Sequence, residues 1–160
     1  MDKTSDGHGA IPAGIYCFED SLGFLLGRLK GRMAAVLDEE LTALDITHAQ
    51  WVILMRIANG VGRTCGELCR HIAYDTGSMT RMLDRLEEKL LIVRERSAED
   101  RRVVGVSLTE HGLALYPQLQ AAGFRVLARM SAGFSKDEVE QVKSQLRRML
   151  SNLDAHEVAA

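Results

Sequence analysis

The stretch DTGSMTRMLDRLEEKLLIVRERSAEDRRVVGVSLTEHG, residues 75–112, decides how this chain folds. Its first half has helical spacing, since apolar residues recur at steps of three and four and share one face: Met79, Leu83, Leu86 and Leu90. The period then changes to that of strands. Residues 92–96 run outward, residues 97–100 turn, and residues 103–108 return as a β-branched strand. The stretch therefore predicts a helix followed by a β-hairpin.

The opposite face of the predicted helix carries side chains that can form hydrogen bonds with DNA. Arginine can donate two bonds to a guanine, and hydroxyl groups can bond to phosphates or base edges. Such a helix followed by a basic hairpin is typical of a winged helix-turn-helix, in which the helix enters the major groove. The candidate contacts are Thr64, Thr76, Ser78, Thr80, Arg81 and Arg85, with Arg101 and Arg102 at the hairpin tip.

Plainer interpretations of these residues stay open. The helix face could simply be solvated, with Asp84 paired to Arg81. Arg85 could pair with Glu88 or a phosphate rather than read a base, and the hairpin could be an ordinary charged turn.

Three motifs within this stretch resemble the MarR family of bacterial transcription regulators. TRMLDRLEEK at residues 80–89 is similar to the family pattern TR-x-LDRLE, DRR at 100–102 to its D-x-R wing tip, and LTEHG at 108–112 to its LT-x-x-G. The likeness extends over roughly residues 20–155. It implies a homodimer that binds a pseudo-palindromic double-stranded DNA operator, usually as a repressor. It also implies that Arg102 enters the minor groove and that Asp100 orients this arginine or tightens the turn.

One position departs from the family pattern. The family usually has glycine directly after the DNA-reading helix, where this chain has Leu90. Glycine ends a helix there in a left-handed conformation that leucine adopts only with strain. We therefore expect either a differently shaped turn into the wing or a longer helix.

The flanking sequence predicts a mainly α fold (α+β), in which long terminal helices form a dimerisation region. The first and last helices have apolar stripes too long to be buried on one small winged domain, which favours a homodimer. We expect a tail at 1–17, a helical dimerisation region at 18–46 and 109–155, a winged helix-turn-helix lobe at 47–108 and a tail at 156–160.

Helix-capping residues place the individual helices. A first helix should run from about 18 to 44, and Thr47 with Gln50 forms a capping box for a helix to about 59. Thr64 caps a short helix to about 72, and residues 74–77 form the turn into the DNA-reading helix. Thr109 caps a helix to about 131, in which Pro117 predicts a kink or a late start. The last helix should begin at Ser135.

Composition describes an ordinary globular chain of 160 residues with a formal charge of −2. Residues 61–108 hold nine Lys/Arg and eight Asp/Glu, so the acidic surplus lies elsewhere, and net charge neither supports nor excludes DNA binding. No apolar run approaches a membrane span and no secretory signal is evident, so we expect a cytoplasmic protein without membrane contact.

Small-molecule control is the usual regulation in the family that the chain resembles. Small phenolic, aromatic or carboxylate effectors enter between the dimer helices and the winged lobe, and such a site needs an apolar cleft with polar anchors. Arg28, His48 and Trp51 are the candidate anchors. Trp51 as a core residue and His48 as an exposed helix-start residue are the alternatives.

Three cysteines are too few for a disulfide framework. Cys65 and Cys69 have helical spacing but no second pair of ligands, so we expect small buried side chains and no metal site. Cys17 precedes the first helix, near where a peroxide-sensing branch of the MarR family has its sensor cysteine, although several residues too early and without the accompanying tyrosines.

The sequence favours a regulator over an enzyme. It has no nucleophile elbow, glycine-rich phosphate loop or zinc-protease motif, and no cofactor is implied. The alternatives to a ligand-released repressor are a thiol- or metal-responsive regulator of the same fold and a winged-helix module that binds protein.

Overall fold

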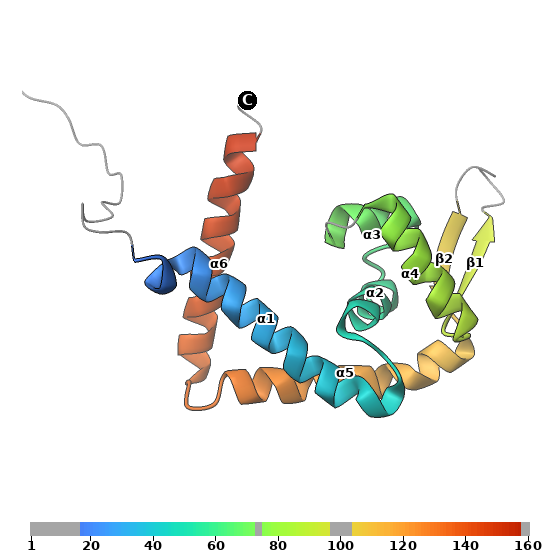
Figure 1. Cartoon of the computed structure of the whole chain (residues 1–160), viewed down its shortest axis with the longest axis horizontal. Coiled ribbons are helices and arrows are strands. Elements are labelled where there is room, and N and C mark those ends of the chain that lie inside the picture. The colour runs from blue at the N-terminus through green and yellow to red at the C-terminus, as the bar shows by residue number, and fades with distance from the viewer. Residues whose placement is uncertain (1–16, 73–74, 97–103, 158–160) are drawn as a thin grey trace, which may run out of the picture.

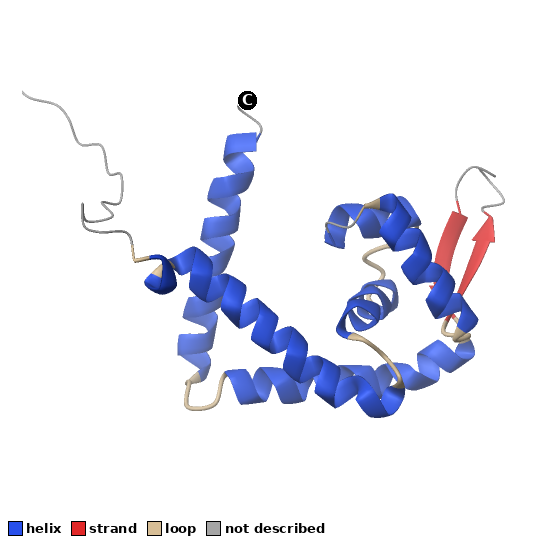
Figure 2. Cartoon of the chain, viewed as in Figure 1, coloured by secondary structure: helices blue, strands red, loops and turns tan. Residues whose placement is uncertain are grey.

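The computed structural model describes residues 17–72, 75–96 and 104–157, and its helices and strands follow the predicted order (Figure 1). Most of this part is helical, with one small antiparallel sheet (Figure 2). The elements are a 3-10 turn Phe18–Asp20, α1 Leu22–Leu41, a 3-10 turn Thr42–Leu44, α2 His48–Ala58, α3 Cys65–Ile72, α4 Thr76–Glu88, β1 Ile92–Arg96, β2 Val104–Leu108, α5 Glu110–Met130 and α6 Lys136–Glu157.

The core lies where α1 and α5 meet the winged lobe. In Figure 1, α2, α3, α4 and the two strands gather at one end, α5 runs along the base, α1 slants down to meet α5, and α6 rises toward the other end. Only the C-terminal half of α1 enters this core, since the α1 residues that are buried there are Leu37 and Leu41. The other fully buried side chains include Ile53, Leu54, Leu68, Met79, Leu83, Leu86, Ile92 and Leu119.

Side-chain caps start the helices as the sequence predicts, with one correction. Thr47 and Gln50 form the expected capping box of α2, and the Thr109 hydroxyl accepts the backbone N–H of Gly112 at 3.0 Å. The expected turn at residues 74–77 is too long. Asp75 is the N-cap of α4, and its Oδ1 accepts the backbone N–H of Ser78 at 2.9 Å. Thr76 therefore begins α4 instead of preceding it.

Two long helices differ from their predicted bounds. The first is divided into α1 and two flanking 3-10 turns, and it ends where Asp45 adopts a left-handed conformation with φ of 53°. α5 begins at Glu110, well before Pro117, and continues through it as one helix. The late start considered for α5 is therefore wrong.

The wing pairs β1 with β2 in antiparallel register, from Ile92 opposite Leu108 to Arg96 opposite Val104. The segment before α3 pairs with β2 through an isolated bridge: Thr64 bridges Gly105, and the Arg63 carbonyl accepts the backbone N–H of Val106 at 2.7 Å. The wing is thereby attached to the helix-turn-helix at its base as well as through the chain.

The departure at Leu90 does not change the turn. Leu90 itself adopts the left-handed conformation, with φ of 57°, and α4 ends at Glu88 as it would before a glycine. The N–H of Leu91 bonds the carbonyl of Leu86 at 3.0 Å, and the N–H of Leu90 bonds the carbonyl of Glu87 at 2.8 Å. This is the Schellman arrangement, in which the two buried leucines, 86 and 91, take the positions that usually pack together. Both expectations, a differently shaped turn and a longer helix, are therefore wrong.

We predict that Leu90→Gly stabilises the protein. The left-handed conformation costs a residue with a Cβ about 1–2 kcal/mol. Glycine avoids this cost, but it lowers the folding stability by up to ~1 kcal/mol because its unfolded chain has more conformational freedom. The Leu90 side chain is 68% exposed, so its removal loses little packing. The free energy of unfolding in urea should rise by roughly 0.5–1 kcal/mol. Leu90→Ala, which keeps the Cβ, is the matched control, and an equal gain from both variants would contradict the strain argument.

Candidate nucleic-acid interface

The exposed face of α4 presents two arginines that the rest of the described chain leaves unengaged. Arg81 and Arg85 lie one turn apart, both are exposed, and neither forms an ion pair with another described residue. The buried side of the same helix holds Met79, Leu83 and Leu86 in the core. α4 is therefore fixed along one face while its cationic face is open to a phosphate or a base edge.

The hydroxyl groups near the start of α4 are less free than the arginines. The Thr80 hydroxyl donates to the carbonyl of Thr76 at 2.8 Å, which leaves its lone pairs available for a partner. Ser78 is half-buried. Hydrogen bonds from its hydroxyl and then from its backbone N–H lower the pKa of Asp75. Thr64 is half-buried as well, and its hydroxyl accepts the N–H of Glu67 at 3.2 Å as the cap of α3.

An ion-pair network connects α4 to the wing. Arg94 of β1 lies 2.6 Å from Asp84 and 2.5 Å from Glu87, and its Nε donates to Glu87 at 2.9 Å. Side-chain hydrogen bonds from Arg94 lower the pKa of Glu87, and that of Arg94 is raised by the same bonds. The alternative in which Asp84 pairs with Arg81 is wrong, because Asp84 faces Arg94. The three residues of this network hold the hairpin against the DNA-reading helix.

Sequence reasoning did not identify Arg94 as a positioning residue. The available signal was a pair of carboxylates three residues apart on one helix, followed by an arginine in the next strand, which are Asp84, Glu87 and Arg94. The proposed wing-tip contacts Arg101 and Arg102, together with Asp100, lie outside the described residues.

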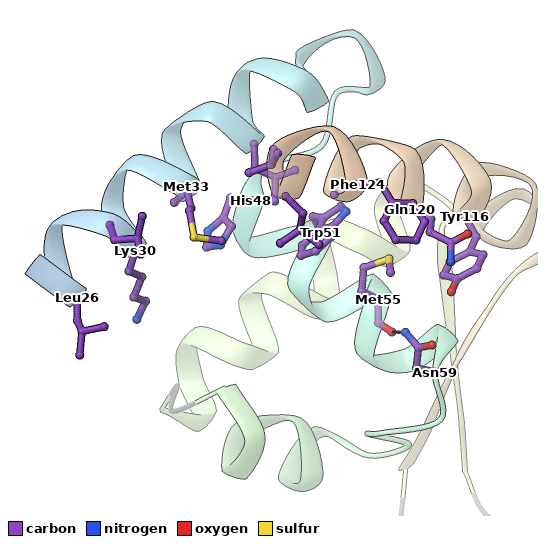
Figure 3. Close-up of a pocket in the computed structure, with 16 residues that line it drawn as sticks. Leu26, Lys30, Met33, His48, Trp51, Met55, Asn59, Tyr116, Gln120 and Phe124 are labelled. Carbon is purple, nitrogen blue, oxygen red and sulfur yellow. Dashed lines mark hydrogen bonds between the residues drawn. The ribbon is translucent and has the colours of Figure 1, made fainter. Parts of the chain in front are cut away.

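A second site is the cavity of about 500 Å³ between α1, α2 and α5 (Figure 3). Its wall is mostly apolar, with Met33 from α1, Trp51 and Met55 from α2, and Phe124 from α5. The polar groups on the wall are Lys30, His48, Asn59, Tyr116 and Gln120.

The structure brings two of the three expected effector anchors together. His48 and Trp51 line the cavity, whereas Arg28 does not, and Lys30 of the same helix lies on the wall instead. The Trp51 indole N–H donates to the Leu119 carbonyl at 2.8 Å, so its ring is held in a fixed orientation. A Cβ at Gly123 would lie 2.8 Å from the Trp51 ring, so only glycine leaves room for the indole there.

The three cysteines occupy two different environments. Cys17 is exposed at the start of the first 3-10 turn. Cys65 and Cys69 are half-buried on α3, which corrects the expectation that they are buried in the core. Burial raises the pKa of the Cys69 thiol, and the neighbouring Cys65 raises it further. No group of three or more His, Cys, Asp or Glu side chains that could hold a metal occurs within the described ranges.

The geometry of α3, α4 and the β1–β2 hairpin defines a winged helix-turn-helix protein. The MarR family model matches residues 46–104. Apo wild-type MarR from E. coli is 33% identical over 81% of this chain and 96% of its own, with a TM-score of 0.69. A cysteine-to-serine mutant of E. coli MarR complexed with operator DNA is 34% identical over 81% of this chain and 93% of its own, with a TM-score of 0.74. A regulator from Methanosarcina mazei, 22% identical over 81% and 94%, shares the fold with a TM-score of 0.76.

The chain therefore belongs to the MarR family, whose members are DNA-binding transcription regulators and not enzymes. Among the described helices, none combines the length and the apolar character that crossing a membrane requires.

We predict that Glu87→Gln lowers stability in a pH-dependent way. Because Arg94 lowers the pKa of Glu87 in the folded state, the ionised carboxylate contributes stability above its unfolded pKa of about 4.3, and loses it as pH falls through the lower folded value. The side chain is 38% exposed, so solvent screening limits the effect at pH 7 to roughly 0.5–1 kcal/mol.

Urea unfolding at a series of pH values measures this difference. The parent and Glu87→Gln curves should converge once pH has fallen below the lowered folded pKa of Glu87. Glu88→Gln is the control, because Glu88 is an exposed neighbour that forms no ion pair with a described residue. A pH-independent difference for Glu87→Gln would show that the network contributes no charge-dependent stability.

Proposed function

We propose that this protein is a homodimeric repressor that binds a pseudo-palindromic operator and is released from it by a small aromatic carboxylate. The observation that carries the proposal is the exposed, unengaged arginine face of α4 on a helix whose other face is fixed in the core. The comparison with the E. coli MarR mutant crystallised with operator DNA supports the same use of this fold.

The dimer is supported by apolar surface that the single chain leaves uncovered. α6 makes at most marginal contact with the other described elements, and Val142, Leu150 and Leu153 on it are 48%, 60% and 68% exposed. The N-terminal half of α1 exposes Leu22, Leu25, Leu26 and Leu29 as well. A soluble monomer rarely exposes so much contiguous apolar surface. A second copy, arranged by two-fold symmetry, would cover both helices and present two α4 helices to one duplex.

The position of the cavity supports the proposed release by a ligand. Its wall combines α1 and α5, which we assign to the dimer body, with α2 of the winged lobe. A carboxylate could pair with Lys30 while its ring contacts Trp51 and Phe124, since all three lie on this wall. A ligand that binds one arrangement of the lobe and body more tightly shifts the population toward that arrangement. Lys30 thereby replaces Arg28 as the proposed cationic anchor.

We predict that Arg81→Ala weakens binding to a duplex that the purified protein selects from a random-sequence pool. The loss should be about 1–3 kcal/mol on selected DNA and smaller on unrelated DNA, since a base contact carries the difference. Arg102→Ala should weaken binding to both DNAs more evenly. Fluorescence anisotropy at several salt concentrations measures each affinity, and the slope should be steep because counterions are released.

Arg148→Ala removes the same charge from exposed α6 and is the control, with an expected change below the error of the assay. Unchanged affinity of Arg81→Ala would remove α4 from the interface. An absence of salt-dependent DNA binding in the parent would favour the protein-interaction alternative.

We predict that benzoate quenches or shifts the fluorescence of Trp51, the one tryptophan in the sequence, and that Lys30→Met weakens this response. Loss of one charge-assisted contact of about 1.5–2 kcal/mol corresponds to a roughly 10–30-fold rise in Kd. Arg28→Met is the matched control on the same helix, because Arg28 lies outside the cavity wall. A larger effect from Arg28→Met than from Lys30→Met would return the anchor to Arg28.

A further inference from the structure

Two thiols on α3 face two threonines in the first turns of α4. Cys65 and Cys69 are four residues apart, so they lie on one side of the helix, and both are half-buried. The Cys65 Sγ lies 4.0 Å from the Thr80 Oγ1. Burial raises the pKa of the Cys69 thiol, the neighbouring Cys65 raises it further and the Thr76 side chain lowers it, so both Cys65 and Thr76 lie near Cys69. The thiol pair thus lies beside the first turns of α4, with Cys65 in contact with Thr80.

We propose that Cys65 and Cys69 form a binding site for one soft, two-coordinate monovalent cation of the Cu(I) or Ag(I) class. Thiolate sulfur is the preferred ligand of such cations. Two sulfurs without a third His, Cys, Asp or Glu ligand among the described residues match a two-coordinate cation better than a tetrahedral site built from those residues. Metal–sulfur bonds of about 2.3 Å place the two sulfurs about 4.6 Å apart, a span that side chains at i and i+4 can reach.

The binding step exchanges protons for the cation. Each thiol releases one proton, two metal–sulfur bonds form, and no electron is transferred. Two neutral thiols and one cation therefore become a complex with a single negative charge. Oxidation to a disulfide fits the same pair less well, because Cβ atoms at i and i+4 on a helix are about 5–6 Å apart, whereas a disulfide needs about 3.8 Å.

Occupation of the site should weaken DNA binding, a consequence that rests on the proposed function. If the Cys65 sulfur turns toward a shared cation, it gives up its contact with Thr80 in the second turn of α4. The anionic complex also lies near the positive N-terminal end of α4, where a DNA phosphate would otherwise be favoured. Both effects oppose the DNA-bound arrangement.

Metal binding is tested on the full chain without DNA. Anaerobic titration with Cu(I) against a competing chelator, and with Ag(I) as a redox-inert probe, should give one equivalent bound. Cys65→Ser and Cys69→Ser should each lower the affinity at least a hundredfold. Cys17→Ser should bind as the parent does, because Cys17 is exposed and lies on a different element.

A footprint on the unmodified protein keeps the test independent of how the variants fold. One equivalent of Cu(I) should protect Cys65 and Cys69 from iodoacetamide while Cys17 is alkylated at its original rate, as measured by mass spectrometry. Equal alkylation of all three thiols with and without Cu(I), or an undiminished equivalent in Cys65→Ser, would overturn the site.

The effect on DNA is measured separately with the selected duplex. One equivalent of Cu(I) should raise the Kd at least tenfold in the parent and in Cys17→Ser, and leave it unchanged in Cys65→Ser. Metal binding with no change in Kd would overturn the regulatory consequence alone. Failure of the metal-free parent to bind any duplex would overturn the proposed function and leave the metal site standing.

Discussion

The backbone junction at Leu91 fixes the position of the wing relative to the DNA-reading helix. Its carbonyl accepts the N–H of Thr109 at 3.1 Å, and the Thr109 hydroxyl donates to the carbonyl of Leu90 at 2.6 Å. A Cβ at Gly112 would overlap the Leu91 carbonyl oxygen, so α5 approaches this closely only because glycine is there. The end of α4, the base of the hairpin and the start of α5 are therefore held at one point, mainly by backbone atoms and small residues.

Electrostatics around this junction separate structural charges from available ones. Arg94 is paired with Asp84 and Glu87, so these three charges of the winged segment are engaged within the fold. Lys89 of the same segment is paired with Asp45, whereas Arg81 and Arg85 are exposed and form no ion pair with a described residue. This explains why net charge carries so little information about DNA binding in this chain. What matters is which cations the fold leaves unpaired.

Local sequence signals predicted the helices and strands well because each such signal acts over only a few residues. Hydrophobic period and capping side chains placed the starts of α2, α3, α5 and α6, and Thr47 with Gln50 forms the capping box that was expected. The misses come from longer-range packing. Leu90 adopts a left-handed conformation because this turn lets Leu86 and Leu91 be buried on either side of it. The strain expected at Leu90 from its own backbone conformation does not include the free energy gained by that burial.

The sites were less predictable than the elements, since a site depends on where helices cross. Charge alone could not decide whether Arg28 or Lys30 faces the cavity, because the choice depends on the rotation of α1 against α5. Likewise, the spacing of Cys65 and Cys69 indicated a shared face without showing that this face meets the first turns of α4. Both answers required the packed structure.

The division of α1 into two halves sets the condition that any effector must meet. Its C-terminal half is buried in the core at Leu37 and Leu41, its N-terminal half is exposed and apolar, and the cavity opens between them at Lys30 and Met33. Moving a two-state equilibrium from 1:99 to 99:1 takes about 10⁴-fold preference for one state. A ligand that contacted α1 and α5 alone would bind both arrangements equally and shift nothing. Under the proposed release, in which α2 moves with the winged lobe, contact with Trp51 or another α2 residue is therefore required.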